Sequence, residues 1–215
     1  MSFRSLLFER LTTFYLDLDV HAPLEHEFEG LELVRPSIAD LYRLRLAEPE
    51  EFSANKMSVL EDRLATDAEV WLVRERAGDW AGWCHMAWGR GPNSRINHTL
   101  RMLPNEVYLF DDHTLVRFRR QGIHGFTVHE RLAGARKRGA VRAITTITRG
   151  NSASVESFLK IGFRPRSQLL YIRPLRRSIE VPLNPAWTSW IGARPSAGIG
   201  SLQRGKGAKS GEAAE

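Results

Sequence analysis

A short basic turn, Arg119 to Gly125 (Arg-Arg-Gln-Gly-Ile-His-Gly), lies between an apolar run that ends at Val116 and a segment with helical spacing. Backbone N–H groups in the first turn of a helix have no partner inside the helix, and they carry the positive end of the helix dipole. Glycine lets an anion approach these groups closely. The pattern therefore predicts a phosphate-binding turn at the start of a helix.

A second polar element, Asn151 to Phe163, follows the turn after one further β-like run, Arg142 to Thr148. With this element the chain resembles the GNAT superfamily of N-acyltransferases. The turn is similar to that family's acyl-CoA signature, Arg/Gln-x-x-Gly-x-Gly/Ala, and the second element to its closing motif, Asn-x-x-Ala/Ser-x-x-x-Tyr-x-Lys-x-Gly-Phe. The resemblance is tight from Thr114 to Phe163 and extends over about Leu31 to Arg173.

The resemblance implies an α/β fold with a mixed, mainly antiparallel sheet flanked by helices, in which a splayed strand pair binds acyl-CoA. Acetyl-CoA would be the acyl donor, with its pyrophosphate on the backbone N–H groups of Arg120 to Gly125. A strand N–H near Val116 would polarise the thioester carbonyl, as in an oxyanion hole. The residues implied at the donor site are Val116, Arg117, Arg119, Arg120, Gln121, Gly122, Ile123, His124, Gly125, Asn151, Ser154 and Phe158.

Two positions depart from the family pattern: His124 replaces a small residue in the turn, and Phe158 replaces the usual Tyr. The imidazole of His124 either donates a hydrogen bond to a phosphate or points to solvent while the backbone binds alone. We favour the second, because the binding geometry depends on main-chain groups. In much of the family the Tyr is thought to protonate the departing thiolate, which Phe158 cannot do. Tyr171 or a water would substitute, or the chain is a non-catalytic module that binds acyl-CoA or an acyl-carrier protein.

Acyl transfer needs an unprotonated amine, and because free amines of the lysine type have a pKa near about 10.4, a base or a water relay should help. Asp111 and His113 share one face of the strand before the turn, and imidazole has a pKa of about 6.5, which suits a general base. His113 could equally be a strand-end residue bonded to a neighbouring acid. Glu106 lies on the other face, and a bulge would change this parity. Asp111, His113 and Glu106 are therefore alternatives for the catalytic base.

The positive charge of the chain is concentrated around the turn. The whole chain has a net charge of +6, while residues 115–142 carry eight basic side chains against Glu130, a net charge of +7. Such a field suits a ligand with several phosphates, such as coenzyme A. Nucleic acid, an acidic carrier protein or a merely solvated helix face would also fit, but the turn favours acyl-CoA over nucleic acid as the partner.

Hydrophobic periodicity predicts the elements that position these residues. Thr12 to Asp19 alternates and is interpreted as an added edge strand. Ser37 and Asp40 resemble a capping box that begins a first helix. The other expected elements are a strand at 31–36, a helix carrying Met57, Leu60 and Leu64, a hairpin of 70–73 with 80–88, a loop at 89–104, a strand at 106–116, a helix from Ile123, a strand at 142–148, a helix at 151–161, a strand at 168–173, and a further strand or ribbon in 174–184.

Length and composition predict one soluble domain. The 215 residues divide into an N-terminal extension (1–30), a GNAT-like domain (31–191) and a disordered basic tail (192–215) rich in Gly, Ala, Ser and Lys. We find no apolar run long enough for a membrane span and no secretory signal, and the single cysteine, Cys84, excludes an internal disulfide and a cysteine-rich metal site. We expect a cytoplasmic enzyme without a metal, acting on a small amine or peptide acceptor, and a homodimer through a sheet edge is one option.

Overall fold

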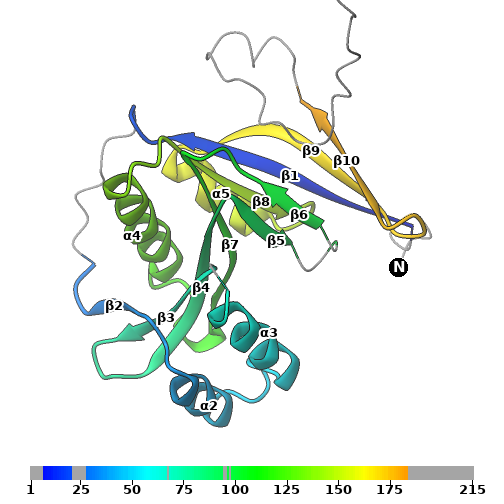
Figure 1. The fold of residues 1–215 in the computed structure, drawn as a ribbon. Coiled ribbons are helices and arrows are strands. Elements are labelled where there is room, and N and C mark those ends of the chain that lie inside the picture. Colours follow the sequence, from blue (N-terminus) through cyan, green and yellow to red (C-terminus); the bar gives the residue numbers. More distant parts are fainter. Residues whose placement is uncertain (1–6, 21–27, 67, 94–95, 97, 184–215) are drawn as a thin grey trace, which may run out of the picture.

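The computed structural model describes residues 7–20, 28–66, 68–93, 96 and 98–183, and it shows one twisted sheet with helices on both faces (Figure 1). A short 3-10 helix, Val116–Phe118, follows the strand before the basic turn. The other elements are β1 (Phe8–Asp17), β2 (Leu31–Val34), α2 (Ile38–Ala47), α3 (Ala54–Leu64), β3 (Glu69–Glu75), β4 (Trp80–Trp88), β5 (Arg90–Asn93), β6 (His98–Arg101), β7 (Glu106–Thr114), α4 (Ile123–Lys137), β8 (Arg142–Thr148), α5 (Ser152–Ile161), β9 (Arg164–Ile172) and β10 (Arg177–Pro182).

The main sheet has eight strands in the order β10-β9-β1-β8-β7-β4-β3-β2. Its neighbouring strands are antiparallel except β7 and β8, which run parallel. Alternate residues of the strands face opposite layers. On one face, Val107 and Leu109 of β7 pack with Val128 of α4 and Phe158 of α5. On the other, α2 and α3 cover β3 and β4 around Trp83. The predicted α/β class and the mixed, mainly antiparallel sheet are thus confirmed.

Strand β1 lies inside the sheet, so its prediction as an added edge strand is wrong. Thr12 pairs with Ile147 of β8 on one side and with Gln168 of β9 on the other. Phe14 and Leu16 are buried in the core beneath α4 and α5, as the alternation predicted, but Tyr15 on the other face is buried as well. Alternation reports which faces of a strand are buried, but it carries no information about whether the strand has one hydrogen-bonded neighbour or two.

Most of the other predicted elements are present, with two corrections. The hairpin β3–β4 is confirmed, with Leu72 paired to Trp83, and β10 occupies the predicted C-terminal strand region. The expected loop at 89–104 instead contains the antiparallel ribbon β5–β6. The strand before the turn ends at Thr114 rather than 116. The expected tail, 192–215, lies outside the described residues.

Candidate functional site

The sheet opens between β7 and β8. These strands pair in parallel only from Glu106 with Arg142 to Leu109 with Thr145. Beyond that point β7 continues along β4, and β8 continues along β1. A bulge at Asp111, whose φ of 52° is positive, places an extra residue of β7 opposite β4 and bends the strand. The splayed strand pair that we expected is therefore present, and its edges face each other across the gap.

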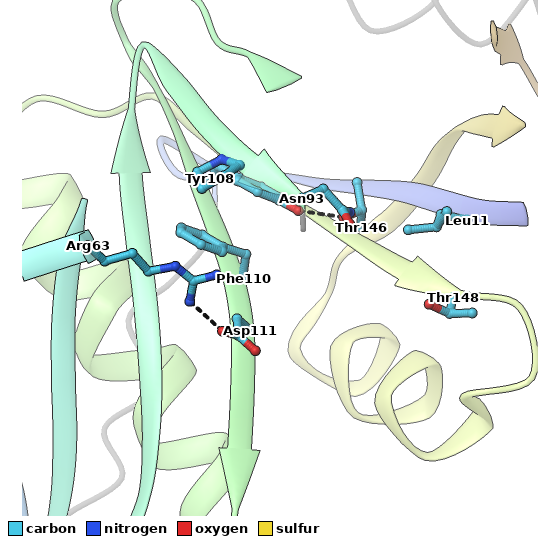
Figure 2. A pocket seen from close by; sticks show the side chains of 9 residues that line it. Leu11, Arg63, Asn93, Tyr108, Phe110, Asp111, Thr146 and Thr148 are labelled. Carbon is cyan, nitrogen blue, oxygen red and sulfur yellow. Dashed lines mark hydrogen bonds and ion pairs between the residues drawn. The ribbon is translucent and has the colours of Figure 1, made fainter. Parts of the chain in front are cut away.

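A pocket of about 160 Å³ lies beside this opening, on the face that carries α3 and the β5–β6 ribbon (Figure 2). The stacked rings of Tyr108 and Phe110, with centroids 4.9 Å apart, form one wall. Its polar groups come from α3, β5, β7 and β8. The complete lining is Leu11, Arg63, Pro92, Asn93, Tyr108, Phe110, Asp111, Thr146 and Thr148.

Asp111 and Arg63 line this pocket and belong to a polar cluster beside it, which we call the Asp111 cluster (Lys56, Arg63, His85 and Asp111). Lys56 Nζ lies 2.9 Å from Asp111 Oδ1, and Arg63 Nη1 donates to Asp111 Oδ2. Burial alone would raise the pKa of Asp111, but the interactions with His85, Lys56 and Arg63 hold it below its ordinary value. Asp111 is therefore an ionised carboxylate at neutral pH.

His85 supports this cluster as a neutral imidazole. Its Nδ1 lies 3.3 Å from the Asp111 backbone oxygen, and its Nε2 lies 3.1 Å from Arg63 Nη1. Since arginine can only donate, Nε2 is the acceptor and Nδ1 carries the proton. Burial lowers the pKa of His85 from its ordinary value of 6.5 to about 3. His85 therefore has no charge at neutral pH.

The lowered pKa of His85 predicts acid sensitivity. Between pH 6.5 and about 3 the unfolded chain protonates His85 while the folded chain does not, so stability falls as pH drops through this window. At pH 5 the loss relative to pH 7 is about 2 kcal/mol. In His85→Gln, whose amide can replace both hydrogen bonds, this part of the loss should disappear. Urea unfolding at pH 7 and pH 5 measures it, and an equal loss in both proteins would contradict the assignment.

Three polar side chains on the pocket wall form a hydrogen-bonded row. Tyr108 Oη lies 2.6 Å from Thr146 Oγ1, and Asn93 Nδ2 donates to the same Thr146 oxygen at 3.1 Å. Whichever of the two hydroxyls donates to the other, one hydroxyl proton remains for a further acceptor. Burial raises the pKa of Tyr108 to about 12, so this phenol keeps its proton at neutral pH. No sequence pattern indicates this row, because its members come from three separate strands.

The other two candidates for the base lie elsewhere. His113 Nε2 is 2.9 Å from Glu51 Oε2, and its ring stacks on Trp83 with centroids 4.2 Å apart. This matches the alternative in which His113 is bonded to a nearby acid. Glu106 is 1% exposed and lies 3.4 Å from Arg142 Nη1, at the opposite end of β7. Of the three alternatives, the structure brings Asp111 alone into this pocket.

Val116 does not present its N–H to the strand opening as expected. It lies in the 3-10 helix after β7, and its N–H donates to Glu51 Oε1 at 3.0 Å. Burial would raise the pKa of Glu51, but the hydrogen bonds from Val116 and His113 lower it overall. Glu51 thus fixes the end of β7 as an ionised carboxylate. The sequence could not reveal this partner, which lies 65 residues earlier in the chain.

The basic turn has the backbone form that an anion site needs. Gly122 is the N-cap of α4, with a positive φ of 79°, and Arg120 also has a positive φ of 65°. Ser37, Ser53 and Asn151 cap α2, α3 and α5 with their side chains, whereas Gly122 has no side chain to do so. Among the described residues no side chain caps the first amides of α4, so these amides are open to another acceptor.

The side chains of the turn point in different directions. Arg119 Nε donates to the Thr114 oxygen at 3.2 Å, and the Gln121 amide donates to the Arg117 oxygen at 3.4 Å. Arg117 itself pairs with Glu48 and Asp79 at 3.0 and 3.1 Å. Ile123 is buried. The side-chain contacts thus stiffen the turn, and its main chain is the part that is suited to binding an anion.

His124 points into the protein, so the favoured prediction that it faces solvent is wrong. Its Nδ1 lies 2.8 Å from Ser157 Oγ, and its Nε2 lies 3.6 Å from Asp112 Oδ2. The ring also meets Phe158 edge to face, with centroids 5.2 Å apart. Burial lowers the pKa of His124, although Asp112 acts to raise it. The reason is local: α5 packs beside the first turn of α4 and offers a hydroxyl and an aromatic ring.

The second motif has structural roles in this chain. Asn151 is the N-cap of α5, and its side chain accepts a hydrogen bond from the Ser154 N–H at 3.3 Å. Phe158 is 4% exposed and packs against Phe163 in the core. Neither Phe158 nor Tyr171 lines the pocket. The phenol that does is on Tyr108, which the sequence analysis did not single out.

The positive charge around the turn is largely paired within the protein. Arg131 forms two hydrogen bonds with Asp112, Arg138 contacts Glu69, and Arg142 contacts Asp17. The net charge of residues 115–142 therefore does not form one continuous basic surface. This arrangement argues against nucleic acid as a ligand of this segment.

No protein-family model and no curated protein matches the sequence, but solved structures match the fold. A GCN5-related N-acetyltransferase from Sphaerobacter thermophilus matches with a TM-score of 0.53 and 13% identity, over 82% of this chain and 53% of that one. A tandem GNAT protein from the clavulanic acid biosynthesis pathway matches with a TM-score of 0.54 and 15% identity, over 80% of this chain and 54% of that one. A GCN5-related glucosamine N-acetyltransferase region in a fungal multi-domain GH3 β-N-acetylglucosaminidase matches with a TM-score of 0.57 and 10% identity, over 74% of this chain and 20% of that one.

The chain thus spans about half of the length of the first two of these proteins and a fifth of the third. At such identities the likeness concerns the fold. This chain has the fold of the GNAT superfamily of N-acetyltransferases, as the two motifs predicted. Within the described residues, no helix is long and apolar enough to cross a membrane, and no group of three or more His, Cys, Asp or Glu side chains could hold a metal ion.

Proposed function

We propose that this protein is an N-acyltransferase that moves an acetyl group from acetyl-CoA to a primary amine. The observation that carries the proposal is the opening between β7 and β8, where the two strands stop pairing beside the pocket at Asp111. The names of proteins with this fold support the reaction class. The single cysteine, Cys84, suits a reducing compartment, and we place the reaction in the cytoplasm.

The donor would bind at the turn through main-chain groups. The amides from Arg120 to Gly125 fit a pyrophosphate because Gly122 provides no capping side chain and allows a close approach. Arg119 and Arg120 would add charge-assisted hydrogen bonds. Acetyl-CoA supplies a thioester, whose carbonyl carbon the amine attacks. Because Glu51 accepts from the Val116 N–H, we no longer assign the thioester carbonyl to that group.

Asp111 is our candidate for the base. It is ionised, partly exposed and directed to the pocket, so it can accept a proton from the attacking amine directly or through a water. Its lowered pKa keeps it in the ionised, proton-accepting form at neutral pH. Tyr108 keeps its proton at neutral pH and is our candidate donor to the departing thiolate, in place of the hydroxyl that Phe158 lacks.

The proposal predicts thiol release from acetyl-CoA that depends on an added amine. Asp111→Asn should lower kcat by about 10²–10⁴, the usual contribution of a general base. Asp62→Asn, which changes an exposed acid on α3, is the matched control and should keep wild-type activity. Circular dichroism and CoA binding check that both variants fold. CoA binding by the wild type without any amine-dependent thiol release would contradict acyl transfer and support the alternative, a non-catalytic acyl-CoA or acyl-carrier-protein binding module.

A further inference from the structure

The Asp111 cluster has one more positive charge than negative charge. Lys56 and Arg63 both contact the single carboxylate of Asp111, and His85 is neutral at pH 7. The side chain of Arg63 is 7% exposed, so little water solvates its charge. An unbalanced charge in such a place costs free energy that a bound anion would offset.

Arg63, which lines the pocket, also has unused hydrogen-bonding capacity. Among the described residues, its side chain bonds to Asp111 and His85, and both contacts use Nη1. The Nε–H and Nη2–H groups lie on the other edge of the guanidinium. Such an edge binds a carboxylate through two parallel hydrogen bonds. Figure 2 shows the guanidinium beside Phe110 and Asp111, and its carbon is 5.1 Å from the Phe110 ring centroid.

The remaining walls limit what else can bind. Tyr108 and Phe110 present flat rings, and Leu11 and Pro92 add apolar contacts. The volume of about 160 Å³ suits a small molecule. Asp111 and Arg63 both line it and form an ion pair with each other, so the pocket offers a negative and a positive group to one ligand.

We propose that the acceptor is a small amino carboxylate, whose carboxylate is bound by Arg63 and whose amine lies at Asp111. This assignment of the substrate class rests on the proposed function, because it takes the pocket to be the acceptor site. The attacking amine would then stand beside the candidate base, at the opening between β7 and β8.

Calorimetric titration of the full chain in the presence of CoA tests this proposal. Alanine and β-alanine are compared with alaninamide and β-alaninamide, which keep the amine and lose the carboxylate charge. We expect at least one acid to bind about tenfold or more tightly than its amide, the worth of a charge-assisted hydrogen bond. The pair that shows the difference distinguishes an α-amino from a β-amino acceptor. Equal binding within both pairs, or no binding of either acid, would overturn the inference.

Variants test whether the preference for the acid over the amide depends on the Asp111 cluster. Arg63→Met should remove the preference for the acid, whereas Arg74→Met, the same change at a surface ion pair with Glu32, should keep it. If Arg63→Met does not fold, Lys56→Met tests the same charge at a more exposed position and should reduce the preference. A retained preference in the folded variant would contradict the role of the cluster.

The two proposals fail in different ways. Binding of the acids without thiol release would defeat acyl transfer and leave the carboxylate site standing. Thiol release that is as fast with ethylamine as with alanine and β-alanine would keep acyl transfer and overturn the amino carboxylate.

Discussion

Removal of residues 1–17 is expected to abolish cooperative folding, because it takes a strand out of the middle of the sheet. Without β1, β9 and β10 lose their hydrogen-bonded connection to β8. Burial of Leu11, Phe14, Tyr15 and Leu16 contributes about 1.5–3 kcal/mol each, a sum comparable to the stability of a whole domain, about 5–15 kcal/mol. Circular dichroism and urea unfolding of the truncated chain would measure the loss.

A second truncation tests whether the expected loss of folding comes from the interior position of β1 or from any shortening of the chain. A chain that ends at Arg173 lacks β10, which pairs with β9 alone and forms one edge of the sheet. It should keep a cooperative unfolding transition. If the chain lacking residues 1–17 also unfolds cooperatively, β1 is not an interior strand of the folded protein.

The fold was predictable because its evidence is local. The turn at Gly122, the strand after it and the helix capped by Asn151 follow one another within about 50 residues, and their order and spacing identify the arrangement. Hydrophobic periodicity added the elements around them. The interior position of β1 could not be predicted in this way, because both of its partners lie more than 120 residues later in the chain.

The candidate site was only partly predictable, because its charged side chains come from residues that are far apart in the sequence. Strand periodicity placed Asp111 near the turn, but its partners Lys56 and Arg63 come from α3, 55 and 48 residues earlier. Helical spacing identifies the apolar side of α3 and says nothing of which acid its lysine and arginine will meet. The same limit applies to Glu51, whose carboxylate forms hydrogen bonds with both His113 and the Val116 N–H. The departures at His124 and Phe158 were visible, but their packing against each other was not.

Asp112 faces the opposite side of the sheet from Asp111, and its partner there supports the second large prediction. The Arg131 side chain is fully buried, donates two hydrogen bonds to the Asp112 carboxylate at 2.8 and 2.5 Å, and also donates to the His85 backbone oxygen at 2.6 Å. It ties α4 to β7 and β4 directly behind the Asp111 cluster. Burial of such a charge is tolerable only while its partner remains.

Arg131→Met should therefore lower the free energy of unfolding by about 3–5 kcal/mol, because it leaves the Asp112 carboxylate buried without its cation. Arg74→Met, the same change in an exposed pair with Glu32, should cost about 0–1 kcal/mol. Adding Asp112→Asn to Arg131→Met removes the stranded charge and should restore part of the loss, so the two substitutions should not be additive. Urea unfolding of the single and double variants at pH 7 measures all three effects. If Arg131→Met costs no more than Arg74→Met, this ion pair does not hold α4 against the sheet.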